Sequence, residues 1–163
     1  MMPQQHTARV NVADIISPER ISCGVEAQSK KRALEAVSEL IARDEKDIST
    51  HDVFDSLLAR ERLGATGVGH GVAIPHGRLP RSDHAIGALV RLKQGVDFGA
   101  ADNEPVDLLF ALLVPEQSTE EHLRILAALA AMFSDEEFRR RVREADTPEE
   151  MYRLLREWSA RGD

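Results

Sequence analysis

Apolar residues recur every three or four positions in two segments of the first half of the chain. The first segment, residues 29–44, predicts a helix capped at its start by the hydroxyl of Ser29. The second predicts a helix from Ser49 or Thr50 to Arg62, which Gly64 ends. The residues expected to face the core are Ala33, Leu34, Val37, Leu40, Ile41, Val53, Phe54, Leu57 and Leu58.

The middle of the chain carries short aliphatic runs that predict strands at residues 72–74, 85–92 and 105–115, and a further short strand is predicted at 21–25. The run at 105–115 is almost continuously apolar, which is typical of a strand covered on both faces. The polar, glycine-containing segment 95–104 predicts a turn between neighbouring strands.

Three helices are predicted after the last strand, at residues 118–133, 134–145 and 147–160. Each begins with Ser or Thr followed within three residues by Glu, an arrangement that satisfies the free amide groups of a first helical turn. Strands in the middle with helices before and after them predict a single α/β or α+β domain whose sheet is covered by helices. This pattern does not set the order of the strands.

Composition fits one globular domain: the 163 residues are 42% hydrophobic and 30% charged. We expect residues 1–12 to be a flexible segment and residues 13–163 to form the domain. The net charge of −7 argues against nucleic acid as a partner, and the basic run at residues 139–144 is interpreted as a solvated helix face. No apolar stretch is long enough to span a bilayer, so no membrane insertion is expected. The first residues do not resemble a signal peptide and Cys23 has no second cysteine to pair with, which together favour the cytoplasm.

His76 stands between Pro75 and Gly77 in the glycine-rich stretch GATGVGHGVAIPHGRLP, residues 64–80. Proline favours extended backbone before it and glycine permits a sharp turn, so we expect a loop that presents the ring at a strand end beside open space. A hydrolytic triad is disfavoured because the chain has no G-x-S-x-G turn. A metal site is unsupported, since His70 and His76 lack the close Cys or His pairs of a zinc site. A nucleophilic imidazole that accepts a phosphoryl group remains the third possibility.

Such an imidazole needs donors that stabilise the charge on the phosphoryl oxygens. Arg60 offers a planar fork of donors, and Thr66 with the amides of Gly67 and Gly69 offers neutral ones. His122 lies in the first turn of a predicted helix, where its ring is expected to face a cleft. On that helix the residues expected to face the core are Leu123, Leu126 and Leu129 or Ala130.

Two blocks of the chain resemble one family. The stretch RERLGATGVGHGVAIPHGRLP, residues 60–80, closely resembles the phosphorylation-site signature of the mannitol/fructose-type enzyme IIA domains of the bacterial phosphotransferase system, above all their nitrogen-regulatory branch. The stretch EEHLRILAALAAMF, residues 120–133, resembles the second block of that family, and the likeness extends from about residue 15 to 158. Ala65 and His70 depart from the family pattern, which often has Ser at the first position and Asn or Lys at the second.

The resemblance implies an α/β sandwich with a mixed central sheet and helices on both faces. It implies that His76 accepts a phosphoryl group from the phosphohistidine of an HPr-like carrier, that His122 is the second histidine of the site, and that Arg60 steadies the phosphoryl group. Such a protein is a phosphotransferase component rather than a stand-alone enzyme, and it needs no cofactor and no metal.

Two outputs are compatible with the resemblance. The nitrogen-regulatory branch implies phosphorylation-dependent binding to regulatory targets such as potassium transporters or sensor kinases. The alternative is a sugar-specific enzyme IIA that passes the phosphoryl group to a fructose/mannitol-type membrane transporter.

Overall fold

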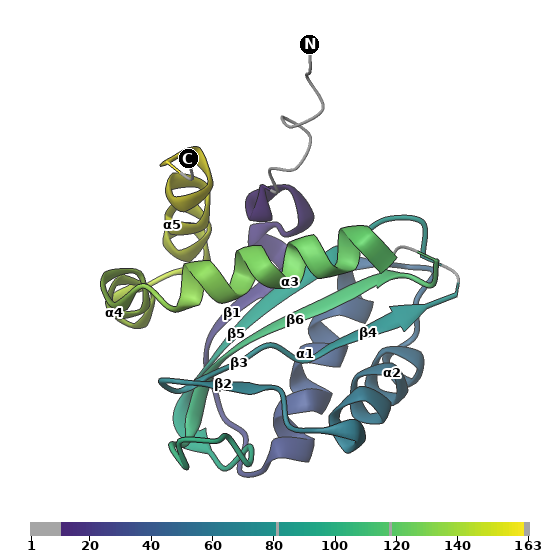
Figure 1. Cartoon of the computed structure of the whole chain (residues 1–163), viewed down its shortest axis with the longest axis horizontal. Coiled ribbons are helices and arrows are strands. Elements are labelled where there is room, and N and C mark those ends of the chain that lie inside the picture. The colour runs from purple at the N-terminus through teal and green to yellow at the C-terminus, as the bar shows by residue number, and fades with distance from the viewer. Residues whose placement is uncertain (1–10, 81, 118, 162–163) are drawn as a thin grey trace.

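A mixed sheet forms the middle layer of the molecule, between two layers of helices (Figure 1). The computed structural model describes residues 11–80, 82–117 and 119–161. Its strands are β1 (Ile21–Val25), β2 (Gly67–Gly69), β3 (Val72–Ala73), β4 (His76–Leu79), β5 (Ile86–Val96) and β6 (Val106–Pro115). Its α-helices are α1 (Lys30–Asp44), α2 (Thr50–Leu63), α3 (Thr119–Phe133), α4 (Glu136–Glu144) and α5 (Pro148–Arg161). This arrangement confirms the predicted α/β fold with a mixed sheet.

The strands are ordered β1-β5-β6-β3-β2, and β4 also pairs with β6. β5 and β6 form an antiparallel pair, which confirms the turn predicted between them, whereas β1 runs parallel to β5. β3 and β4 both run parallel to β6 and share one of its edges, with Val72 opposite Leu108 and His76 opposite Leu112. No described strand pairs with the outer edge of β4.

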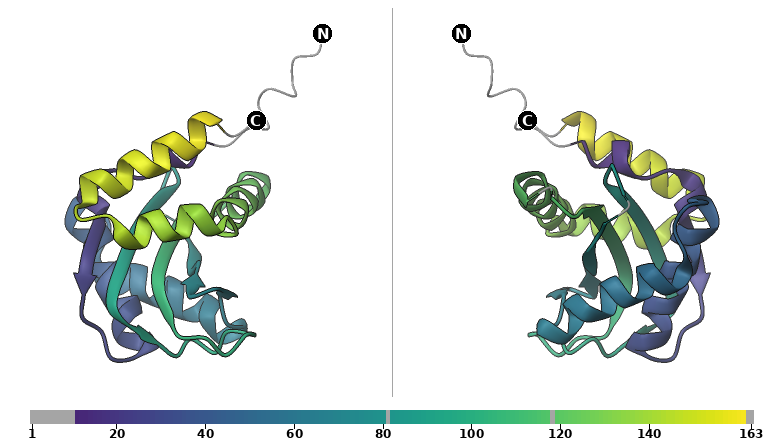
Figure 2. Two further views of the ribbon diagram at one scale, coloured as in Figure 1. Left: turned by 90° about the vertical axis from the view of Figure 1, so that its left-hand side faces the viewer. Right: turned by 90° about the vertical axis from the view of Figure 1, so that its right-hand side faces the viewer.

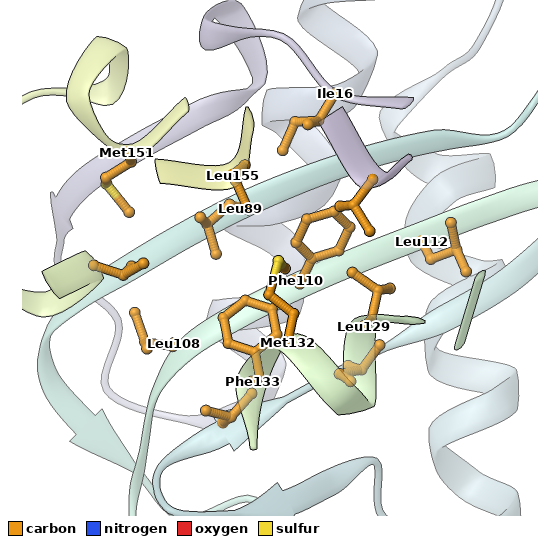
Figure 3. Close-up of a cluster of buried hydrophobic side chains, with 14 of the residues drawn as sticks. Ile16, Leu89, Leu108, Phe110, Leu112, Leu129, Met132, Phe133, Met151 and Leu155 are labelled. Carbon is orange, nitrogen blue, oxygen red and sulfur yellow. The ribbon is translucent and has the colours of Figure 1, made fainter. Parts of the chain in front are cut away.

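The alternating side chains of β6 enter two separate cores. Leu108, Phe110 and Leu112 pack with α3, α4 and α5, where they meet Met132 and Phe133 (Figure 3). The intervening residues of β6 pack on the other face against α1 and α2, and they are Leu109, Ala111 and Leu113. Views along the sheet show the two helical layers on opposite sides of it (Figure 2). The prediction that residues 105–115 form a strand covered on both faces is therefore confirmed.

Most helices begin at or near the residue that the sequence predicted. The hydroxyls of Ser29 and Ser49 accept hydrogen bonds from backbone amides of the first turns of α1 and α2, and the cap at Ser29 was predicted. α4 begins later than expected because the carboxylate of Asp135, not the hydroxyl of Ser134, caps it. The predicted cap Ser118 lies outside the described residues. None of the helices in the described ranges combines the length and the apolar character needed to cross a bilayer.

The first described residues are packed against the domain. Val12 opens a 3-10 helix, Val12–Ile15, and is buried, although we expected flexibility up to this position. The hydroxyl of Tyr152 in α5 donates to the carbonyl of Ala13 and links α5 to this 3-10 helix. The rest of the segment expected to be flexible, residues 1–10, lies outside the described residues.

Candidate functional site

His76 is the first residue of strand β4, where the sequence predicted a loop. Ile74 and Pro75 separate β3 from β4, and pairing with β6 resumes at His76. Side chains alternate along a strand, so Gly77 and Leu79 face α2 while His76 faces the opposite side, where α3 lies. The strand therefore fixes the direction of the ring.

Hydrogen bonds determine which nitrogen of the His76 ring carries the proton. Nδ1 lies 2.8 Å from the carbonyl oxygen of Ile74, and because a carbonyl only accepts, Nδ1 carries the proton. Nε2 then holds a lone pair, and it accepts a hydrogen bond from Nε of Arg60 at 3.2 Å. Burial lowers the pKa of His76, and the positive charges of Arg60 and Arg78 lower it further, although the Ile74 hydrogen bond acts in the other direction. The ring is thus neutral near pH 7 and has a nucleophilic nitrogen.

Arg60 reaches His76 from the last turn of α2. While Nε donates to His76, Nη1 donates to the carbonyl oxygen of Gly64 at 2.8 Å. The two bonds hold the guanidinium plane beside Nε2. The structure thus brings the arginine and the histidine together, as the sequence predicted.

His122 approaches the same ring from α3. The two ring centroids lie 5.2 Å apart with the planes at 85°, an edge-to-face arrangement. His122 is 7% exposed, and neither ring nitrogen has a hydrogen-bond partner among the described residues. Leaving a buried polar group without a partner costs about 1–3 kcal/mol, so the arrangement favours a ligand that accepts a hydrogen bond from this ring.

The orientation of α3 differs from the prediction. Leu123 is 63% exposed and Ala130 is exposed as well, while His122 and Leu129 lie on the buried face. The segment is apolar on almost all sides, so spacing alone did not reveal which residues face the core. The buried residues of α3 are His122, Ile125, Leu129, Met132 and Phe133.

A surface depression surrounds the two histidines. Its lining residues are Ser56, Ala59, Arg60, Leu63, His76, Gly77, Arg78 and His122. Arg78 was not predicted as a site residue; its Nη1 donates to the carbonyl oxygen of Glu116 at 2.9 Å. Had β4 been predicted as a strand, Arg78 would have been placed on the same face as His76, two residues away.

The three predicted neutral donors lie elsewhere. The hydroxyl of Thr66 donates to Oε1 of Glu61 at 2.6 Å, and its amide donates to Oε2 at 2.9 Å. Gly67 lies against Ala100, and Gly69 lies against Asp102. None of the three lines the depression around His76.

His70 is separated from the site. It adopts φ of 58° in the turn between β2 and β3, where its amide donates to Asp102 and its carbonyl accepts from Arg143. It lines a different pocket from the one that contains His76. Among the described residues, no group of three or more Cys, His, Asp or Glu side chains is placed to hold a metal ion.

Gly77 allows β4 to approach α2 closely. A Cβ atom at this position would lie 2.1 Å from Oγ and 3.0 Å from the backbone oxygen of Ser56. The Ser56 hydroxyl already donates to the carbonyl oxygen of Arg78, so it is tied in place. The sequence suggested a sharp turn at Gly77; the structure shows a strand residue whose missing side chain makes room for a helix.

Gly77→Ala should therefore destabilise the protein by about 1–3 kcal/mol, because α2 must move away from β4 to admit the methyl group. Denaturant unfolding measures this change as a lower midpoint. Gly64→Ala is the matched control, because a Cβ at Gly64 meets nothing within 4 Å. Equal midpoints for the two variants would contradict the proposed close approach.

The buried ring of His122 should make stability depend on pH. Burial, followed by the charges of His76, Arg78 and Arg60, lowers the pKa of His122 from 6.5 to about 4. The unfolded chain then binds a proton more readily than the folded one between these values, so stability is lost as pH falls below about 6.5. Between pH 7.5 and 5.0 this ring alone should lower the free energy of unfolding by about 2 kcal/mol.

Denaturant unfolding of the wild type and of His122→Gln at both pH values isolates this contribution, because carboxylates and the other histidines titrate in both proteins. The expected result is a smaller loss of stability in the variant. The same loss in both proteins would show that His122 titrates normally in the folded state.

Comparisons with known proteins identify the family of the chain. Residues 14–158 match the family described as "Phosphoenolpyruvate-dependent sugar phosphotransferase system, EIIA 2". A nitrogen regulatory protein of Pseudomonas aeruginosa is 44% identical over 146 residues, which cover 90% of this chain and 95% of that protein. A fructose-specific EIIA component of Haloferax volcanii is 36% identical over 152 residues, which cover 91% of this chain and 98% of that protein.

A solved structure extends the likeness to the fold. The crystal structure of the nitrogen regulatory protein IIA-Ntr from Neisseria meningitidis superposes with a TM-score of 0.83 at 42% identity, and the match covers 88% of this chain and 98% of that one. The family match, the sequence relatives and the shared fold agree. The chain belongs to the EIIA 2 family of the phosphoenolpyruvate-dependent sugar phosphotransferase system.

Proposed function

We propose that this protein is a cytoplasmic phosphocarrier that accepts a phosphoryl group on Nε2 of His76 from the phosphohistidine of an HPr-like protein. The observation that carries the proposal is the state of the His76 ring: Nδ1–H is bound to the carbonyl of Ile74, and Nε2 keeps its lone pair beside Arg60. A neutral imidazole held in one tautomer, with a lone pair on its second nitrogen, is the form that attacks phosphorus.

In the proposed transfer, one bond to phosphorus forms as another breaks. The lone pair of Nε2 forms a bond to phosphorus while the bond between phosphorus and the donor's histidine nitrogen breaks, and that electron pair stays with the donor. The Nδ1 proton remains on its hydrogen bond to Ile74, so the ring of His76 gains positive charge that offsets part of the phosphoryl charge. Arg60 shifts from Nε2 to the phosphoryl oxygens, where its planar donors match their geometry.

His122 supplies a second donor. In the neutral form that its lowered pKa maintains at pH 7, one of its nitrogens carries a proton. Because both nitrogens lack a partner among the described residues, a phosphoryl oxygen would satisfy the donor that the resting protein leaves free.

Exposed apolar side chains beside the site support docking of another protein. Leu63 lines the depression and is 84% exposed, and Leu123, next to His122, is 63% exposed. A large apolar side chain exposed at the rim of a reactive depression, as Leu63 is, is typical of a protein contact surface. A carrier protein that brings a phosphohistidine to His76 would cover them.

The output we propose is regulatory, through protein binding that depends on phosphorylation of His76. The support is similarity: a relative at 44% identity and the Neisseria structure at 42% identity are both named as nitrogen regulatory proteins. The potassium transporters and sensor kinases associated with that branch are the targets to test first. The second candidate, a sugar-specific component, is supported by the fructose-specific relative at 36% identity.

The test is phosphorylation in a reconstituted chain of phosphoenolpyruvate, enzyme I and an HPr-like carrier. The expected product is a single phosphoryl adduct by intact mass that is lost in acid and kept in base, as a phosphohistidine requires. Full charging of the carrier without any adduct on this protein would overturn the proposal. Addition of a fructose- or mannitol-type transporter domain separates the outputs, because only a sugar-specific component should lose its phosphoryl group rapidly to that domain.

A further inference from the structure

Glu61 follows Arg60 in α2 and has a buried carboxylate. The residue is 6% exposed, and its carboxylate accepts hydrogen bonds from the backbone amide and the hydroxyl of Thr66. The ammonium of Lys30, in α1, lies 2.8 Å from Oε2. A buried charge is tolerated when hydrogen bonds and an opposite charge satisfy it, and Glu61 has both. It therefore fixes Thr66 relative to two helices.

One set of hydrogen bonds connects Glu61 to Nδ1 of His76. Thr66, held by the carboxylate, accepts the amide of Ile74 on its carbonyl oxygen at 3.0 Å. The carbonyl oxygen of Ile74 then accepts the Nδ1 proton of His76 at 2.8 Å. Ile74, whose carbonyl selects the tautomer of the ring, is thus held by Thr66. Thr66 is in turn held by Glu61.

A second set connects Glu61 to Nε2 of His76. The segment between Glu61 and Thr66 contains Gly64, whose amide donates to the backbone oxygen of Glu61 at 3.2 Å. The carbonyl oxygen of Gly64 accepts from Arg60 at 2.8 Å, and Arg60 donates to Nε2. Bonds at both ends of this short segment fix the carbonyl that directs the guanidinium.

We propose that Glu61 is a positioning residue of the His76 site: by holding Thr66, it keeps the proton on Nδ1 and directs Arg60 at Nε2. Its effect on phosphoryl transfer rests on the function proposed above, whereas its effect on the ring is a property of the unphosphorylated protein. The inference also gives Thr66 a positioning role, because its hydroxyl belongs to this set of bonds and the residue does not line the depression around His76.

The test compares Glu61→Gln with wild type in two measurements. Glutamine keeps the size of the side chain but replaces one acceptor oxygen with an amide donor, so it cannot accept from Thr66 and pair with Lys30 as the carboxylate does. Nitrogen-15 NMR of the His76 ring in the unphosphorylated protein should show a mixture of tautomers in the variant where the wild type has Nδ1–H. The phosphorylation rate should fall about 10- to 100-fold, since misplacement of a reacting group by about 1 Å has effects of that size.

Asp107→Asn is the matched control. It neutralises a different carboxylate, partly buried, which is paired with Arg143 and does not line the depression around His76. We expect this variant to lose stability while its His76 tautomer and phosphorylation rate stay within twofold of wild type. An equal change in both variants would mean that general loosening, rather than positioning, is responsible, and it would overturn the proposal.

A folded Glu61→Gln protein with the wild-type tautomer and rate would also overturn it. If Glu61→Gln does not fold, Thr66→Val decides the question, because valine keeps the shape of threonine and replaces the hydroxyl that donates to Glu61 with a methyl group. The wild-type tautomer in Thr66→Val would then overturn the proposal, and a mixture would support it. Failure of the wild type to accept a phosphoryl group would refute the proposed function and leave the NMR comparison able to test Glu61.

Discussion

His76→Gln should abolish phosphoryl acceptance, with a loss of roughly 10⁴-fold or more in rate, because replacement of a nucleophile leaves only binding and electrostatic effects behind. Glutamine places an amide where the imidazole has the lone pair of Nε2. An amide is not a nucleophile, so nothing at this position can form a bond to phosphorus. The measurement is the rate of adduct formation by intact mass with a fully charged HPr-like carrier.

His51→Gln is the control for this substitution. His51 also lies in the described part of the chain, but it is exposed on α2 and pairs with Asp55, one turn further along the helix. We expect wild-type phosphorylation from this variant. Persistence of the adduct in His76→Gln would place the acceptor on another residue, and peptide mapping under basic conditions would locate it.

Arg60→Lys should slow phosphorylation on the order of 100-fold while the acceptor histidine remains in place. Lysine keeps the positive charge, so a large effect would show that the planar guanidinium matters rather than charge alone. The guanidinium makes two directed bonds, to Nε2 of His76 and to the carbonyl of Gly64, and a single ammonium on a flexible stem cannot reproduce this geometry. Single-turnover kinetics with saturating charged carrier separates this effect from weaker docking.

The control for the arginine is Arg43→Lys. Arg43 occupies the last turn of α1, as Arg60 does in α2, but it is exposed and does not line the depression. The control should phosphorylate at the wild-type rate. A wild-type rate in Arg60→Lys as well would reduce the role of Arg60 to that of a generic positive charge.

The fold was largely predictable because its main elements have strong patterns. The apolar run at 105–115 became β6, and the regular spacing in α1 and α2 identified their buried faces. The orientation of α3 was not predictable, because small apolar residues surround most of the helix. β4 was missed for a different reason: HGRL has no strand pattern of its own, and its pairing with β6 is what makes it a strand.

The site was predictable where it depends on residue type and not where it depends on contacts between distant segments. His76, Arg60 and His122 meet as the motif implied. The sequence suggested that the hydroxyl of Thr66 donates a hydrogen bond to the phosphoryl oxygens, but the fold shows that it donates to Glu61. The role of Gly77 was likewise hidden, since the approach of Ser56 arises from the packing of α2 on the sheet.

The partners of His76 come from opposite sides of the sheet, Arg60 from α2 and His122 from α3. A molecule that had lost the packing of either helical layer would therefore have no complete site. If the proposed function holds, only fully folded copies would accept a phosphoryl group, and partly unfolded copies would neither consume phosphoryl groups nor bind regulatory targets as the phosphorylated form does.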